Sequence, residues 1–258
     1  MGPAELSAYP LARVGGRGRA ALALLGAALV FAALCGLGFW QVERLHWKEA
    51  LLQTIAERTQ EPPAPLREVE RRWRETGDIE YTPVTAAGVF EHEHERHFFA
   101  TWKGRSGFYV YTPLRLDDGR RLLVNRGFVP YELKNPATRT VGQVEGRVEV
   151  TGLAREPLAE KPSFIVPDND EAQNIFYWKD RDRMAASVGL PTGDDDLVPF
   201  FVDAREGAAP GGWPVGGVTI IDLPNNHLQY ALTWFGLAGT LVVVVGAWIW
   251  RQKRQGAA

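Results

Sequence analysis

The chain has 258 residues, 45% of them apolar, and a formal net charge of −2 at pH 7. This length allows one soluble domain together with membrane segments. The only cysteine is Cys35, which excludes a disulfide within the chain.

Two uncharged stretches predict membrane helices. The first covers residues 20–40, and the second lies within a helix expected at residues 227–250. At about 1.5 Å of rise per residue, each is close to the roughly 30 Å of a bilayer's hydrocarbon core. A cleaved signal peptide is the alternative for the first stretch, but its apolar region would be only about 7–15 residues long. The longer run, which continues into the helical residues after Gln41, favours an uncleaved anchor.

The charges outside these stretches predict the orientation. Residues 1–19 contain three arginines and residues 251–258 contain three basic side chains, and short basic segments stay on the cytoplasmic side of a membrane. Residues 41–226 then form a periplasmic (intermembrane-side) domain. This domain holds 23 of the 29 basic and 30 of the 31 acidic residues, a net charge of −7, which argues against nucleic acid as a partner. Because residues 1–19 make a poor transit peptide, we expect a bacterial inner (plasma) membrane protein with both termini cytoplasmic.

The domain is expected to begin with helices and to continue with strands. The spacing of apolar residues predicts that the first span continues as a helix to Arg58 and that Gly77 ends a short second helix. The period then changes to two, and an Asp118-Gly119 pair predicts a hairpin. Helices are expected at residues 66–75 and 175–188, and strands at residues 82–90, 97–102, 108–116, 121–129, 143–153, 197–203 and 218–222. The sequence therefore predicts an α+β protein, in which two transmembrane helices flank an antiparallel, strand-rich domain folded as a meander or small barrel.

Three of the five histidines cluster between two of the expected strands, at His92, His94 and His97. Alternate residues share one strand face, so His92 and His94 would converge on a metal ion. The spacing differs from the His-Glu-x-x-His pattern of a zinc protease helix. The alternative, which we favour, is a polar hairpin tip.

Two further polar segments have a structural and a functional interpretation. Gly127 predicts a bulge or a close backbone approach within its strand, and Arg126 beside it would pair with a carboxylate or point at an anionic ligand. Residues 167–170 (PDND) would hold a cation with their oxygens, or satisfy the loop backbone and start the following helix. We favour the structural interpretation for both segments.

His227 lies at the start of the second span. Pro224 and one of the two following asparagines are expected to turn and cap the helix. His227, Tyr230 and Trp234 then share one helical face, so their rings would line a single pocket. Neutral imidazole is a common axial ligand of haem iron. The alternative is an interfacial imidazole hydrogen-bonded to Asn225, Asn226 or lipid headgroups, and spacing alone leaves both open.

The sequence contains no signature of an activated nucleophile. It has no Gly-x-Ser-x-Gly motif, no phosphate-binding loop and no cysteine outside the first span. We therefore do not expect an enzyme.

Five short stretches, in chain order, resemble the Surfeit locus protein one family of cytochrome c oxidase assembly factors. Each stretch is weakly specific by itself, whereas all five in order between two spans are more specific. They are residues 38–44 (GFWQVER), 123–128 (LVNRGF), 164–170 (FIVPDND), 176–180 (FYWKD) and 226–235 (NHLQYALTWF).

The resemblance implies an inner-membrane protein that binds haem a transiently and assists its insertion into the catalytic subunit of a haem-copper oxidase. Haem a synthase would be a further partner. The family's membrane histidine maps onto His227, which becomes the expected axial ligand of the haem iron, with Tyr230 and Trp234 beside the cofactor. One alternative is a haem-free membrane scaffold that stabilises oxidase assembly intermediates. Another is an oxidoreductase or metal chaperone that uses the hairpin histidines.

Overall fold

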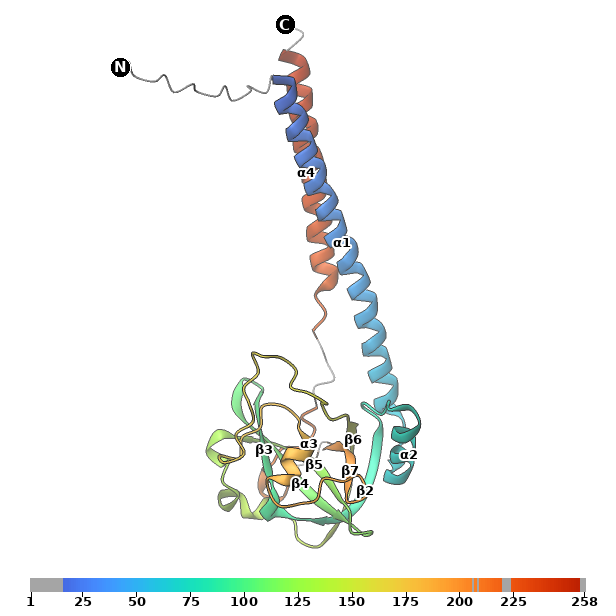
Figure 1. Ribbon diagram of the computed structural model, residues 1–258, viewed down its shortest axis with the longest axis vertical. Coiled ribbons are helices and arrows are strands. Elements are labelled where there is room, and N and C mark those ends of the chain that lie inside the picture. The colour runs from blue at the N-terminus through green and yellow to red at the C-terminus, as the bar shows by residue number, and fades with distance from the viewer. Residues whose placement is uncertain (1–15, 206, 208, 220–223, 256–258) are drawn as a thin grey trace, which may run out of the picture. The chain divides into compact units, whose positions relative to one another are not determined.

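The computed structural model describes residues 16–205, 207, 209–219 and 224–255, which form two compact units (Figure 1). One unit contains the described residues up to Leu52 and those from Pro224 onward. The other contains the described residues from Gln53 to Thr219.

The first unit contains α4 (His227–Gln255) and most of α1 (Gly16–Gln60), two helices that run side by side (Figure 1). The segment 18–60 of α1 and the whole of α4 are long and apolar enough to cross a membrane. Small residues allow the helices to approach closely, and Ala231 and Ala238 are buried on α4. A Cβ atom at Gly38 of α1 would lie 2.6 Å from the ring of Phe235, so a larger residue here would displace that ring.

The end of α1, from Gln53 onward, belongs to the second unit. The helix runs to Gln60 without a break, which confirms the predicted continuation beyond the apolar stretch. At the other end of the chain, α4 extends to Gln255, five residues beyond the apolar stretch. The side of the membrane on which each end lies remains a prediction.

The second unit is built on a seven-stranded sheet with the order β1-β2-β6-β7-β5-β4-β3. An additional antiparallel pairing joins β2 to β4, from Gly88–Phe90 to Leu114–Leu116. This pairing closes β2, β6, β7, β5 and β4 into a ring, so the predicted small barrel is confirmed. The strands are β1 (Ala64–Pro65), β2 (Pro83–Phe90), β3 (Arg96–Trp102), β4 (Arg105–Leu116), β5 (Arg121–Pro130), β6 (Arg147–Arg155) and β7 (Leu197–Ala204).

The prediction of an antiparallel sheet is only partly correct. Most neighbours are antiparallel, but β5 and β7 are parallel, with Val124 opposite Val202 and Asn125 opposite Asp203. The short β1 is also parallel to β2. Parallel neighbours need a long crossover between them, and the chain between β5 and β7 supplies one, because it includes β6 and the short helix α3 (Arg181–Ala186).

Apolar residues on the two faces of β5 and β7 enter different clusters. Leu122, Val124 and Val202 belong to a cluster that also contains Leu66 and Val69 of α2 (Leu66–Thr76). The residues between them, such as Leu123, pack on the opposite face with Phe176 and Met184. Because both faces are covered, these central strands read as continuous apolar runs.

Local turn chemistry agrees with several predicted boundaries. Gly77 ends α2 in the left-handed conformation, with φ of 68°, and its N–H donates to Trp73 O at 2.9 Å. Gly119 has φ of 91° in the β4–β5 turn, so the Asp118-Gly119 hairpin is confirmed. The remaining short helices are 3-10 turns, namely η1 (His92–His94), η2 (Tyr131–Leu133), η3 (Pro136–Gly142) and η4 (Pro210–Gly212).

Three predicted elements differ from the structure. The helix expected at residues 175–188 is limited to Arg181–Ala186, because Phe176 instead exchanges backbone hydrogen bonds with β3 and Asp180 caps the shortened helix. The strand expected from Gln143 starts at Arg147, since Gln143 closes η3 and Gly146 has a positive φ. Residues 218 and 219 are not in a strand, and residues 220–222 lie outside the described part of the chain.

Candidate functional site

The candidate ligand site lies where α4 begins beside α1. Asn225 Oδ1 accepts the backbone N–H of His227 at 3.4 Å, as expected for a helix cap. The His227 ring contacts the neighbouring helix, with Nδ1 at 2.7 Å from Gln41 Oε1. Gln41 is only 9% exposed, so this bond is a partly buried link between the first and the last of the five sequence stretches.

The bond to Gln41 determines which ring nitrogen of His227 carries the proton. An amide oxygen can only accept a hydrogen bond, so Nδ1 of His227 must be the donor. In a neutral imidazole the other nitrogen, Nε2, then keeps its lone pair. A second residue that holds Nδ1–H is the usual way in which proteins orient a metal-binding histidine.

Both helices carry aromatic residues close in sequence to this link. The rings of Phe39 and Phe235 meet edge to face at 5.4 Å. Trp234 is half-buried, and its Nε1–H is buried without an acceptor among the described residues. Tyr230, by contrast, is 54% exposed. The helix therefore presents one unsatisfied donor and one accessible phenol on the turns that follow His227.

A second concentration of polar groups lies in the barrel unit, around the motif at residues 123–128. Asn125 is buried, and its amide donates to Asp203 Oδ1 at 3.0 Å while its oxygen accepts Gly127 N–H at 3.0 Å. Gly127 has φ of 126° where the β4–β5 register shifts. A Cβ atom there would collide with the Val215 carbonyl, which accepts the N–H of Phe128. Both structural predictions for Gly127 are confirmed.

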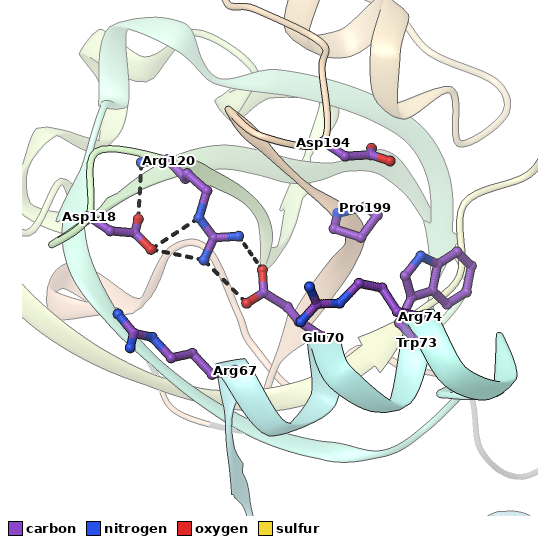
Figure 2. A pocket seen from close by; sticks show the side chains of 8 residues that line it. All are labelled: Arg67, Glu70, Trp73, Arg74, Asp118, Arg120, Asp194 and Pro199. Atoms are coloured by element: carbon purple, nitrogen blue, oxygen red, sulfur yellow. Dashed lines mark hydrogen bonds and ion pairs between the residues drawn. The ribbon is translucent and has the colours of Figure 1, made fainter.

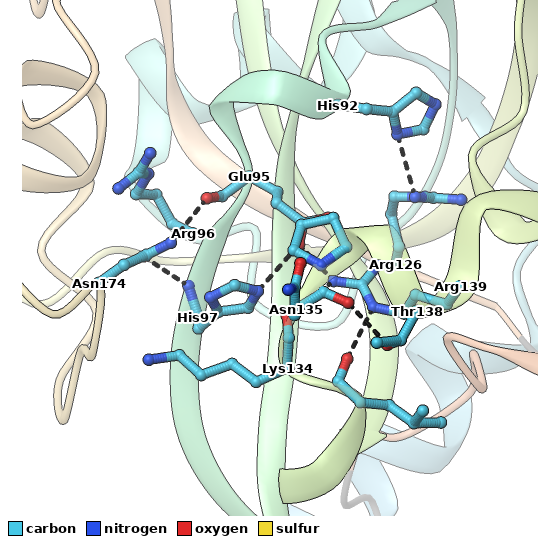
Figure 3. Close-up of polar contacts among 12 residues, drawn as sticks. His92, Glu95, Arg96, His97, Arg126, Lys134, Asn135, Thr138, Arg139 and Asn174 are labelled. Atoms are coloured by element: carbon cyan, nitrogen blue, oxygen red, sulfur yellow. Dashed lines mark hydrogen bonds and ion pairs between the residues drawn. The ribbon is translucent and has the colours of Figure 1, made fainter.

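Arg126 does not pair with a carboxylate in the described part of the chain, so the predicted ion pair is wrong. Its guanidinium donates to His92 Nδ1 at 3.2 Å (Figure 3). It also donates to Gly142 O and lies over the ring of Phe90. The pKa of Arg126 is lowered to about 10, mainly by burial; the Glu95 carboxylate opposes this shift, and the positive charge of Arg139 adds to it. The residue joins β5 to η3 and η1 by hydrogen bonds to neutral acceptors.

The hairpin histidines do not converge. His92 and His94 lie on η1 and not on a strand face, and no group of three potential ligand residues that could hold a metal occurs among the described residues. His92 Nε2–H donates to Val144 O at 2.9 Å, and burial lowers its pKa. His97 contacts Glu95 at 2.9 Å instead. The arrangement gives no support to a metal site in this hairpin.

The favoured polar hairpin tip is also not what the structure contains, because Glu95 and His97 are each 3% exposed. Glu95 Oε1 accepts hydrogen bonds from His97 and from Arg139 of η3 (Figure 3). Burial lowers the pKa of His97, outweighing the opposing effect of Glu95. Burial alone would raise the pKa of Glu95, but the hydrogen bond from His97 and the charge of Arg139 outweigh it and lower the pKa. This buried triad ties β3 to η3.

The loop at residues 164–170 and the following motif at 176–180 hold each other in place. Asn169 Oδ1 accepts the N–H groups of Tyr177 and Trp178 at 2.8 and 3.3 Å. Asp170 Oδ1 accepts the N–H of Gln173 at 2.9 Å. Asp168 pairs with Lys161 at 2.6 Å. These contacts agree with the structural interpretation of the PDND segment, in which the side chains satisfy loop backbone, although no helix starts directly after it.

The barrel unit also contains an open cavity of about 390 Å³ between α2 and the β4–β5 turn (Figure 2). Arg120 crosses it, with Nη2 at 3.2 Å from Glu70 Oε2 and Nε at 3.0 Å from Asp118 Oδ2. Hydrogen bonding to Glu70 is the main cause that raises the pKa of Arg120. Because Arg120 pairs with carboxylates of both α2 and the β4–β5 turn, this network joins the two elements; it is called the clasp below.

Sequence comparison connects these features to known proteins. The SURF1 family model matches residues 28–239. Surfeit locus protein 1 of Mus musculus is 38% identical over 242 residues, which cover 87% of this chain and 73% of the relative. The proteins of the same name from Rattus norvegicus and Homo sapiens are 37% and 35% identical, over 84% of this chain and 71% and 73% of their own lengths. On the family match and these identities, the chain belongs to the SURF1 family.

Proposed function

We propose that this protein is a membrane-bound assembly factor for a haem-copper (cytochrome c) oxidase and that it holds haem a transiently at His227. Membership of the SURF1 family supports the role in oxidase assembly. Two helices of membrane-spanning length and composition support the location. The proposed role is that of a carrier and not of an enzyme, since no bond of the haem is made or broken.

One observation carries the assignment of the haem ligand. The hydrogen bond from His227 Nδ1 to Gln41 leaves the Nε2 lone pair of the neutral ring for the iron. A single protein ligand suits a carrier, because the cofactor has to be released again. Trp234 Nε1–H, buried without an acceptor among the described residues, would offer a hydrogen bond to the bound cofactor, and the exposed ring of Tyr230 would offer it an apolar contact.

The proposal includes a topology and two partners. The basic ends of the chain would lie in the cytoplasm and the acidic barrel unit in the periplasm of a bacterial inner membrane. Haem a synthase would supply the cofactor, and the catalytic subunit of the oxidase would receive it.

The test is to co-express the full-length protein with haem a synthesis, to purify it in detergent and to record its absorption spectrum. We expect bound haem a in the wild type and loss of most of it in His227→Ala. Gln41→Leu should reduce the retained haem and alter the spectrum, because it removes the acceptor that orients the imidazole. His46→Ala is the matched control, since His46 is an exposed histidine of the same helix α1.

If His227→Ala still binds haem a at the wild-type stoichiometry, His227 is not the ligand of the haem iron. A wild-type protein that never carries haem a, but still supports oxidase assembly in cells, would leave the haem-free scaffold as the function.

A further inference from the structure

The barrel unit has two adjacent apolar side chains that point almost completely into solvent. Phe164 is 92% exposed and Ile165 is 77% exposed, in the loop between β6 and α3. No other large apolar side chain among those described exceeds 70%, including those on the two membrane-type helices. Single exposed apolar residues are ordinary, but an adjacent pair at this exposure is typical of an interaction site.

The loop that carries this pair has a defined conformation. Ser163 forms a turn, because its Oγ accepts the N–H of Ile165 and its carbonyl accepts the N–H of Val166, both at 3.2 Å. The ion pair between Lys161 and Asp168, at 2.6 Å, spans the two arms of the loop. A tip that is already held in a hydrogen-bonded turn loses little conformational entropy when it enters a partner.

The charge around the tip indicates what kind of surface it meets. Residues 156–171 contain five carboxylates and a single basic residue, Lys161, and Arg183 of α3 forms an ion pair with Glu171, so the net charge around the loop is −3. Segments that insert into lipid are usually rich in lysine and arginine, and anionic headgroups repel acidic ones. An apolar anchor surrounded by negative charge instead complements an apolar pocket with basic residues at its rim.

We propose that the loop at residues 162–167, here called the Phe164 loop, docks into an apolar, basic-rimmed pocket on a partner protein. Phe164 and Ile165 are the anchors, and the acidic flanks, including the exposed Glu160, provide electrostatic attraction. The identity of the partner as the catalytic subunit of the oxidase rests on the proposed function above.

The test is to measure binding of the full-length protein to the purified catalytic subunit in detergent. We expect Phe164→Ser/Ile165→Ser to weaken binding by at least about tenfold, as for the loss of central interface anchors. Val141→Ser is the matched control, because Val141 is a comparably exposed apolar residue elsewhere on the barrel unit, and it should bind as the wild type does. Glu160→Lys should slow association and reduce its dependence on salt.

Unchanged thermal unfolding of the double variant would show that the loss of affinity is not a loss of fold, since both side chains are exposed. In the wild-type complex, hydrogen exchange of residues 162–167 should slow. Equal affinity of wild type and double variant, or unchanged exchange in the loop, would overturn the proposal. The proposal would also be overturned if the wild type does not bind the subunit. The same holds if Phe164 and Ile165 serve instead to bind anionic vesicles or to form a dimer of this chain.

The two proposals can fail separately. If the assembly role is wrong, the wild type neither carries haem a nor binds the subunit. If only the docking proposal is wrong, the wild type binds the subunit and the double variant binds equally well.

Discussion

Gly127 shows how one residue of the strand motif determines local structure. Its φ of 126° is a conformation that other residues rarely adopt, and the Val215 carbonyl occupies the space that a side chain would need. The close approach allows Val215 and Phe128 to exchange backbone hydrogen bonds at 2.9 and 3.0 Å.

Gly127→Ala should therefore lower the free energy of unfolding by about 2–4 kcal/mol, from strain and steric overlap together. Gly119→Ala is the control, because Gly119 also has a positive φ but nothing lies within 4 Å of its missing Cβ atom. It should cost only about 1 kcal/mol. Thermal unfolding of both variants measures the difference, and equal losses would contradict the role given to Val215.

The buried histidines predict a dependence of stability on pH. Burial lowers the pKa of His92 and of His97 in the folded protein, so the unfolded chain binds protons more readily below its ordinary histidine pKa of about 6.5. The folded protein is therefore most stable, with respect to these two residues, above about pH 6.5. This stability is lost as the pH falls from about 6.5 towards the lower pKa values that His92 and His97 have in the folded protein.

Thermal unfolding of the full-length protein in detergent should accordingly shift to lower temperature between pH 7.5 and pH 5. In a His92→Gln/His97→Gln variant the unfolding temperature should be lower at pH 7.5, but its decline with acidification should be shallower. A decline of the same steepness in both proteins would show that other groups control it.

At the scale of elements, the clasp between α2 and the β4–β5 turn depends on Arg120. Glu70 is only 8% exposed, and Arg120 is the cation that pairs with it. In Asp118, burial opposes ionisation, but the hydrogen bonds from Arg120 outweigh it and lower the pKa. The two carboxylates therefore share one cation at the cavity.

Arg120→Ala should destabilise the barrel unit by about 1–3 kcal/mol, because it leaves the Glu70 carboxylate buried without a partner. Arg147→Ala is the matched control, since Arg147 forms an ion pair with Asp117 in which both side chains are well exposed. Such a pair contributes little, so the control should unfold as the wild type does. Urea unfolding of the wild type and the two variants measures the free energy of unfolding. Equal stability of all three would show that Arg120 does not stabilise the fold.

The short elements around β3 have a similar joining role. Glu95, His97 and Arg139 connect β3 to η3. Phe176 adds backbone hydrogen bonds to His97 and Phe99 of the same strand. An edge strand exposes unpaired backbone groups that promote aggregation. Contacts of this kind cover part of that edge, which explains why residues expected to be a helix are extended here.

At the scale of the whole molecule, the two units carry different proposed tasks. The helical unit offers the histidine and the aromatic residues that suit a cofactor. The barrel unit has an acidic surface and an exposed apolar loop, which suit a protein partner. Each task is tested by variants in one unit with the other unit left intact.

The sequence by itself determined the elements whose signals are local. Uncharged runs predicted both long helices, alternation of apolar residues predicted most strands, and Gly77 and the Asp118-Gly119 pair predicted two chain reversals. The motifs also predicted the family, which the comparisons confirm. Periodicity, turn chemistry and ordered motifs depend on neighbouring residues, and they can therefore be read without the fold.

Only the tertiary structure decided the contacts between residues far apart in the chain. The link from His227 to Gln41 joins positions 186 residues apart, and the parallel pairing of β5 with β7 depends on a crossover that no local pattern encodes. The same holds for Arg126, whose guanidinium meets a carbonyl and an imidazole where the sequence favoured a carboxylate. Hydrogen-bond partners are selected by distance in space, and spacing along the chain gives no measure of that distance.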